Sequence, residues 1–193
     1  MKSLLITGFE PFGGENINPS WEAVSRLPSG IGEYELHKLL VPVVFGEAPK
    51  LVINEAEKLK PDVILCIGQA GGRDSITPEL VAINLRHAKI PDNAGNQPED
   101  EPIIVGGENA LFSTLPVRKM AEALNATGIS SKLSYSAGAY VCNDLLYTLL
   151  DRYKNSETGV AFIHVPYCTE QGKEPSMTME NIVKGLSVLI ENI

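Results

Sequence analysis

Short apolar runs punctuated by glycine and proline predict a set of buried strands. A run of roughly four to eight apolar residues that ends at a turn signal is typical of a strand covered on both faces. By this rule we expect regular strands at residues 4–7, 36–44, 62–67 and 160–165. Residues 76–85 alternate only in part and are expected to be strand-like, and residues 132–136 are expected to form a short strand.

Helical periodicity fills most of the intervals between these strands. In residues 142–153, for example, Leu145, Leu146, Leu149, Leu150 and Tyr153 recur on one helical face. The other expected helices cover residues 21–27, 46–59, 116–124 and 179–193. Strands that alternate with helices predict an α/β fold whose largely parallel sheet is covered on both sides.

Two stretches fit neither period. Residues 8–20 hold several glycines and prolines together with Phe9 and Phe12, so we expect an ordered loop there. Residues 91–107 are rich in proline, glycine and acidic side chains, which predicts an irregular surface excursion. A chain of 193 residues without repeats or a linker is expected to form a single domain.

Composition narrows the classes of partner and compartment. The formal net charge is −8 and no basic block occurs, which argues against a nucleic-acid partner. No apolar stretch approaches the ~20 residues of a membrane helix. The apolar run at residues 4–6 is too short for the core of a signal peptide, so we expect a cytoplasmic protein.

The cysteines point to chemistry rather than to cross-links. There are three, Cys66, Cys142 and Cys168, with no CxxC spacing, so neither a disulfide framework nor a zinc site is expected. Cys66 lies inside an apolar run and is expected to be structural. Cys168 has polar neighbours and no role that its position explains.

Cys142 stands where a loop of small residues enters a predicted helix. The first turn of a helix has unpaired N–H groups and a partial positive charge, which lower the pKa of a thiol there and stabilise an oxyanion. We therefore expect Cys142 to be a nucleophile with an easily ionised thiol. The alternative is a buried structural cysteine, which is a common role for this residue type.

His164 and Glu79 are the candidate partners of Cys142. His164 ends a predicted buried strand, and functional groups of α/β proteins gather beyond such strand ends. Glu79 precedes the apolar residues 80–83, where a carboxylate must be paired or exposed. Pairing would fix the tautomer of His164 and stabilise its imidazolium form. The alternatives are a hydrogen-bonded core histidine and an exposed glutamate.

The glycine-rich loops do not have the spacing of phosphate-binding motifs. Residues 8–14 lack the GxxxxGK[ST] pattern, and residues 68–72 lack GxGxxG. Nucleotide binding is therefore not expected.

Taken together, the sequence motifs resemble the pyroglutamyl peptidase I family. The matching segments occur in the family's order over nearly the whole chain: LITGFEPFGG at 5–14, NPSW at 18–21, GQAGGR at 68–73, TPE at 77–79, VAIN at 81–84, IPDN at 90–93, SAG at 136–138, VCN at 141–143 and IHVPY at 163–167. Each motif is weak alone, and the ordered set is specific.

This resemblance implies a three-layer α/β/α sandwich with a largely parallel, mixed sheet, and residues 1–193 as one peptidase domain. It implies a cysteine peptidase that removes an N-terminal pyroglutamyl residue from peptides through an acyl-enzyme, without metal or cofactor. The catalytic roles fall on Glu79, Cys142 and His164. Family members are often homotetramers, so the resemblance also implies a homo-oligomer.

The family's substrate pocket maps onto residues from several segments. Its apolar walls correspond to Phe9, Phe12, Ile90 and Val141, and the backbone near Asn18 and Gln69 corresponds to the groups that bind the lactam. The chain departs from the family at Leu80 and Lys89, where arginine is usual, and at Tyr140, where phenylalanine is common. Lys89 is accordingly only a possible support for the oxyanion.

Two other readings of the same residues remain open. One is a different cysteine amidase or glutamine-type amidotransferase, whose substrate carries a free amine. The other is an α/β binding module without catalytic activity.

Overall fold

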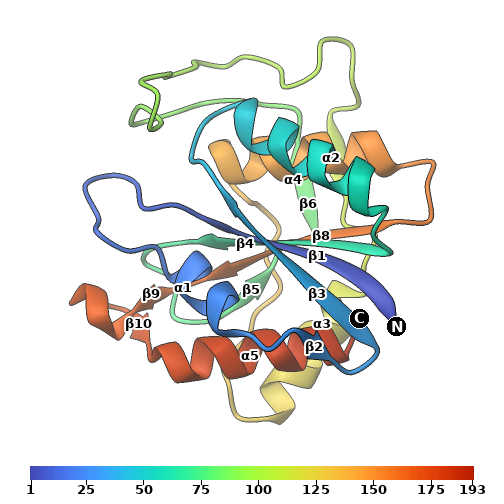
Figure 1. The fold of residues 1–193 in the computed structure, drawn as a ribbon. Helices are drawn as coiled ribbons and strands as arrows, with labels where there is room; N and C mark the ends of the chain where they lie inside the picture. Colours follow the sequence, from blue (N-terminus) through green and yellow to red (C-terminus); the bar gives the residue numbers. More distant parts are fainter.

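A six-stranded sheet forms the centre of the protein (Figure 1). The structure is a computed structural model that describes residues 1–193. The inner strands run parallel, and the short strands at the two edges run antiparallel to their neighbours. The fold is therefore the predicted α/β fold with a largely parallel, mixed sheet. In spatial order the strands are β2 (Gly30–Ile31), β3 (Tyr34–Val41), β1 (Lys2–Phe9), β4 (Val63–Gln69), β8 (Gly159–Val165) and β5 (Thr77–Pro78).

Helices cover both faces of this sheet, which gives the three layers (Figure 1). One face is covered by α2 (Glu47–Leu59) and α4 (Val141–Tyr153). The other is covered by α1 (Pro19–Arg26), α3 (Val117–Ala126) and α5 (Met179–Glu191). None of these helices has the length and apolarity needed to cross a membrane.

The alternation of side chains along each strand divides the core in two. On β4, Leu65 and Ile67 pack beneath α1, α3 and α5, whereas Ile64 and Cys66 pack beneath α2 and α4. Successive strand residues point to opposite faces, so a strand buried on both sides reads as a continuous apolar run. The predicted strands at 4–7, 62–67 and 160–165 are confirmed for this reason.

Short elements and loops make up the rest. The small strands are β6 (Val81–Ile83) with β7 (Ala110–Phe112), and β9 (Tyr167–Cys168) with β10 (Ser176–Met177); a short 3-10 helix, η1, covers Thr169–Gln171. No helix or strand occurs between Asn84 and Asn109, where Figure 1 shows a long loop beside the α2–α4 layer. This region contains the predicted irregular excursion.

The two weaker strand predictions are wrong in detail. Residues 76–85 are divided between β5 and β6 because the backbone changes its hydrogen-bonding partner between Glu79 and Leu80. The Glu79 N–H donates to the Phe162 carbonyl on β8, whereas the Leu80 N–H donates to the Ser134 carbonyl. Residues 132–136 form no continuous strand. Isolated parallel bridges join Ser131 to Ile76 and Ser134 to Glu79, the two residues that flank β5. Pro78 has no N–H to continue this ladder.

Candidate active site

Cys142 and His164 line the same hollow, which has a volume of about 290 Å³. It lies at the carboxyl ends of β1 and β4, where Phe9 and Gln69 end their strands, and Cys142 enters it from the first turn of α4. Its lining includes most of the residues predicted from the sequence: Phe9, Phe12, Asn18, Gln69, Val141, Cys142 and His164. Residues remote in the chain therefore meet at one place.

Buried polar side chains fix the first turn of α4. Asn143 accepts a hydrogen bond from the Ile83 N–H at 3.0 Å and donates to the Ile83 carbonyl at 2.8 Å. Asp144 accepts from the Gly46 N–H at 2.8 Å and from Arg86 Nε at 2.7 Å. Both side chains are fully buried, so the helix that carries Cys142 is held to its surroundings directly beside the thiol.

Gly68 makes room for the thiol. A Cβ atom at this position would stand 3.1 Å from Cys142 Sγ and 2.6 Å from the ring of Phe162. Gly68 also pairs in register with His164 on the adjacent parallel strand, so the two residues face the same side of the sheet. The absent side chain therefore lets Cys142 approach the face of the sheet from which His164 projects.

His164 is held by a buried carboxylate. Its Nδ1 lies 2.6 Å from Glu79 Oε1, and the two residues are 3% and 0% exposed. An ionised carboxylate only accepts hydrogen bonds, so Nδ1 carries the proton and Nε2 keeps its lone pair. No hydrogen bond joins Cys142 to His164, and hydrogen bonds between catalytic side chains often tighten only when substrate binds.

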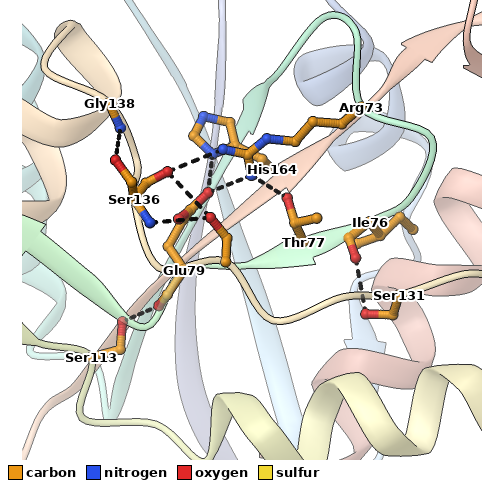
Figure 2. A network of polar contacts seen from close by, with 10 residues as sticks. Arg73, Ile76, Thr77, Glu79, Ser113, Ser131, Ser136, Gly138 and His164 are labelled. Atoms are coloured by element: carbon orange, nitrogen blue, oxygen red, sulfur yellow. Dashed lines mark hydrogen bonds and ion pairs between the residues drawn. The ribbon is translucent and has the colours of Figure 1, made fainter.

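Arg73 completes this cluster. Figure 2 shows its guanidinium and the His164 ring both directed at the Glu79 carboxylate. Nη1 lies 2.7 Å from Glu79 Oε1, and Nη2 donates at 3.1 Å to the Ser136 carbonyl, in the segment that leads to Cys142. Arg73 is not among the site residues predicted from the sequence. Its only signal is the GQAGGR motif, because an arginine in a glycine-rich loop has no periodicity that predicts a partner.

Burial and hydrogen bonding set the charges of the pair. Burial raises the pKa of the Glu79 carboxyl, but hydrogen bonding and charge from His164, together with Arg73, outweigh it and leave that pKa below its ordinary value. Burial lowers the pKa of His164 below 6.5 despite the opposing effect of Glu79, and Arg73 lowers it further. The neutral imidazole beside a carboxylate is thus the favoured state.

The thiol of Cys142 differs from expectation. Burial, reinforced by the negative charge of Glu79, raises its pKa to about 12, although Arg73 acts in the opposite direction. This shift runs opposite to the one expected from the helix terminus, because removal of the thiol from water disfavours the thiolate. A thiol in this state needs a base to remove its proton, and Nε2 of His164 is the available one.

The other end of the hollow is aromatic. The rings of Phe12 and Tyr140 lie 6.3 Å apart, and Tyr140 donates a hydrogen bond to the Pro91 carbonyl at 3.0 Å. Asn18 uses its side chain within the protein, capping α1 and donating to the Glu10 carbonyl at 2.9 Å. A ligand would therefore meet the backbone of Asn18 rather than its amide.

Gln69 is held in the wall by a residue far along the chain. Its Oε1 accepts a hydrogen bond of 2.9 Å from Gln171 Nε2, and η1 supplies Gln171. Gln171 Oε1 in turn accepts a hydrogen bond from the Cys168 N–H at 3.1 Å. Cys168, predicted to lie in a polar loop, is fully buried here, so its neighbourhood supports the wall of the hollow.

Ile90 and Lys89 lie outside this hollow. The structure places both in a neighbouring one of about 370 Å³, beyond the rings of Phe12 and Tyr140. Ile90 is 47% exposed there. Lys89 is thus not among the residues that surround Cys142, which weakens the case for a role at the oxyanion.

Backbone N–H groups at the start of α4 offer a different oxyanion site. The N-cap Tyr140 provides no side-chain cap, and the N–H groups of Val141 and Cys142 find no acceptor within the fold. Such groups point at a ligand in front of the helix. No cluster of three or more histidine, cysteine or acidic side chains is arranged to hold a metal ion. The groups that the site offers are the Cys142 thiol as nucleophile, the His164 imidazole as base and the N–H groups at the start of α4 as oxyanion donors.

Comparisons of the sequence and of the fold with known proteins all point to the same family. The family model described as "Pyroglutamyl peptidase" matches residues 2–193. The chain is 49% identical over 193 residues to a pyrrolidone-carboxylate peptidase of Brachyspira hyodysenteriae, covering 97% of this chain and 96% of the relative. It is 48% identical over 198 residues to that of Thermosipho africanus, covering 98% and 96%. The crystal structure of pyroglutamyl peptidase I from Bacillus amyloliquefaciens superimposes with a TM-score of 0.96 at 43% identity, covering 100% of this chain and 96% of that one.

Proposed function

The chain belongs to the pyroglutamyl peptidase family of cysteine peptidases, which remove N-terminal pyroglutamate, and we propose that Cys142, His164 and Glu79 carry out this reaction. The observation that supports these roles most is the buried Glu79–His164 pair, whose histidine lines the hollow that contains Cys142. A histidine oriented by a carboxylate beside a thiol is the arrangement that activates a cysteine nucleophile.

The first half of the reaction forms an acyl-enzyme. Nε2 of His164 removes the thiol proton of Cys142 as Sγ attacks the carbonyl carbon of the pyroglutamyl residue. The N–H groups of Val141 and Cys142 donate to the oxyanion that results. His164 then passes its proton to the leaving nitrogen, the C–N bond breaks, and the pyroglutamyl group remains on Sγ as a thioester.

The second half releases the acid. A water molecule gives a proton to Nε2 of His164 and attacks the thioester carbonyl. Collapse of the intermediate breaks the C–S bond and returns the proton to Sγ, which restores the thiol. Glu79 remains ionised throughout, because its role is to hold the Nδ1–H tautomer and to stabilise imidazolium.

The hollow suits an uncharged ring. Phe9, Phe12 and Val141 provide apolar walls for a flat lactam, and we expect backbone groups near Asn18 and Gln69 to bind its N–H and C=O. Pyroglutamate has no free amine, and no acidic side chain lines the hollow to bind one. This favours pyroglutamyl peptides over the free-amine substrates of an amidotransferase.

The proposal also covers where the protein is located and how its chains assemble. The three cysteines are free, and a reduced Cys142 requires a reducing compartment, which supports a cytoplasmic location. The likeness to the pyroglutamyl peptidase family leads us to propose a homo-oligomer, with a tetramer as the expected form. Light scattering coupled to size-exclusion chromatography would measure the mass directly, and a monomer at micromolar concentration would contradict this part.

Hydrolysis of a pyroglutamyl arylamide by matched cysteine variants tests the catalytic assignment. Cys142→Ser should lose nearly all activity, whereas Cys66→Ser and Cys168→Ser should keep it. Cys66→Ser is expected to unfold more easily because it buries a hydroxyl in the core. A prolyl arylamide tests the pocket: it lacks the ring carbonyl and carries a charged amine, so kcat/KM should be lower by roughly a thousandfold or more. Comparable values for the two substrates would contradict the lactam pocket.

A further inference from the structure

A second hollow continues from the first. It has a volume of about 730 Å³ and is polar and open to solvent. Arg73 and Ser136 line both hollows, so the second begins where the cluster around Glu79 ends. Its remaining lining comes from the loop after β4, from residues 132–135 and from Pro175. The catalytic roles proposed above do not use this space.

The direction of the leaving group points to this second hollow. His164 must stand beside the leaving nitrogen to protonate it. His164 pairs in register with Thr77, and Thr77 and Arg73 both line the second hollow. The hollow that contains Ile90 lies instead beyond Phe12, on the side of the aromatic walls that would hold the ring. A chain that leaves past His164 therefore enters the second hollow.

One wall of the second hollow is an extended segment with an unpaired backbone edge. The segment 131–136 pairs with residues 76–80 through alternate positions, since Lys132 N–H donates to Ile76 and Ser134 N–H to Pro78. The same alternation turns the N–H and C=O groups of Leu133 to the opposite edge. Tyr135 follows the last bridge, at Ser134, and lies where the chain begins to bend. None of the N–H and C=O groups of these two residues makes a hydrogen bond within the protein, and Tyr135 is 63% exposed. Unpaired edges of this kind bind extended chains.

We propose that residues 133–135 bind the peptide that follows the pyroglutamyl residue of the substrate, as an added strand. This inference rests on the proposed roles of Cys142 and His164, which place the scissile bond at the mouth of the second hollow. Main-chain pairing recognises a peptide of any sequence. Lys132 and Asp74 form an ion pair of 2.8 Å at the surface here, so their opposite charges do not select the charge of the incoming side chains.

Substrate length tests the proposal first. The probes are a pyroglutamyl arylamide and pyroglutamyl oligoalanine amides with one to three alanines. We expect kcat/KM to rise along the peptide series by about fivefold for each main-chain hydrogen bond gained. A flat peptide series, with the arylamide still hydrolysed, would overturn the strand subsite and leave the catalytic assignment intact. Failure to hydrolyse either class would overturn both.

Backbone substitution tests the pairing itself. A methyl group on one amide nitrogen beyond the scissile bond should remove the gain, and the same change at the next nitrogen should have little effect, because successive strand N–H groups point to opposite sides. Equal effects at both positions would overturn strand pairing.

A matched pair of protein variants provides an independent readout. Tyr135→Pro removes an N–H that the fold does not use, and Tyr135→Ala keeps it. The ratio of kcat/KM for the longest peptide to that for the arylamide should fall about fivefold in Tyr135→Pro and remain higher in Tyr135→Ala. An equal fall in both variants would assign the effect to the tyrosine ring and overturn the main-chain proposal.

Discussion

Nδ1 of His164 lies 2.6 Å from Oε1 of Glu79, at the point where the antiparallel edge strand β5 meets β8. Arg73 Nη1 lies 2.7 Å from the same carboxylate oxygen. The other oxygen of Glu79 is buried without a hydrogen-bond partner. One oxygen of this carboxylate therefore binds both the imidazole and the guanidinium. Because an ionised carboxylate only accepts hydrogen bonds, the negative charge of Glu79 keeps the proton of His164 on Nδ1.

Glu79→Gln should therefore reduce kcat by about 10²–10⁴-fold while leaving the protein folded, because the amide retains the shape but not the charge that stabilises imidazolium. Steady-state kinetics with a pyroglutamyl arylamide and a thermal melt check the two parts. Glu122→Gln makes the same chemical change on the exposed face of α3 and should behave as wild type. A Glu79→Gln enzyme with normal kcat would remove Glu79 from the mechanism.

Gly68→Ala should inactivate the enzyme through packing. The added methyl group would meet the Phe162 ring at 2.6 Å and Cys142 Sγ at 3.1 Å, so the thiol or the ring must move. A displacement of the nucleophile by about 1 Å is sufficient to lower kcat by about 10²-fold. The control is Gly30→Ala, where the new atom stands 3.5 Å from its nearest neighbours. Equal activity of the two variants would contradict the placement of the thiol.

The shifted pKa values of Cys142 and His164 predict how thiol alkylation and kcat/KM depend on pH. Because burial raises the pKa of Cys142 to about 12, its alkylation by iodoacetamide in the free enzyme should still accelerate above about pH 9. Because burial lowers the pKa of His164 below 6.5, and only neutral imidazole accepts a proton, kcat/KM should be lost only below pH 6.5. An alkylation rate that reaches its plateau by about pH 7 would instead indicate a preformed thiolate–imidazolium pair.

Lys89→Ala should leave kcat within about threefold of wild type, because Lys89 lies with Ile90 in the hollow beyond Phe12 rather than beside Cys142. Lysine is also a flexible point charge without the rigid fork of arginine. Lys119→Ala, an exposed change on α3, controls for loss of charge. Parallel losses of kcat and kcat/KM of a hundredfold would show that Lys89 reaches the transition state.

The elements that the sequence predicted well are those in which the pattern of buried positions is regular, on both faces of a strand or on one face of a helix. The runs at 62–67 and 160–165 are covered on both faces by helices, so their apolarity alone identifies them as strands. The helices at 46–59 and 142–153 were predicted because one face of each packs against the sheet. Residues 132–136 failed as a strand because the pairing of an edge segment depends on its neighbour, Pro78, rather than on its own pattern.

The site was predictable in part for a similar reason. Cys142 and His164 could be found because each lies at one end of a recognisable element, Cys142 at the start of a helix and His164 near the end of a strand. Arg73 could not be paired with Glu79 from its own loop, since the sheet register that brings Thr77 beside His164 creates that contact. The raised pKa of Cys142 likewise depends on how deeply the packed hollow removes the thiol from water, and no local pattern encodes that depth.

Trapping of the acyl-enzyme tests the central claim most directly. The protein is mixed with a pyroglutamyl thioester or activated ester, quenched in acid and digested, and each peptide is weighed by mass spectrometry. The account predicts one pyroglutamyl group on the peptide that contains Cys142, absent from Cys142→Ala and retained in Cys66→Ser and Cys168→Ser. A pyroglutamyl group on any other residue, or undiminished hydrolysis of a pyroglutamyl arylamide by Cys142→Ala, would contradict it.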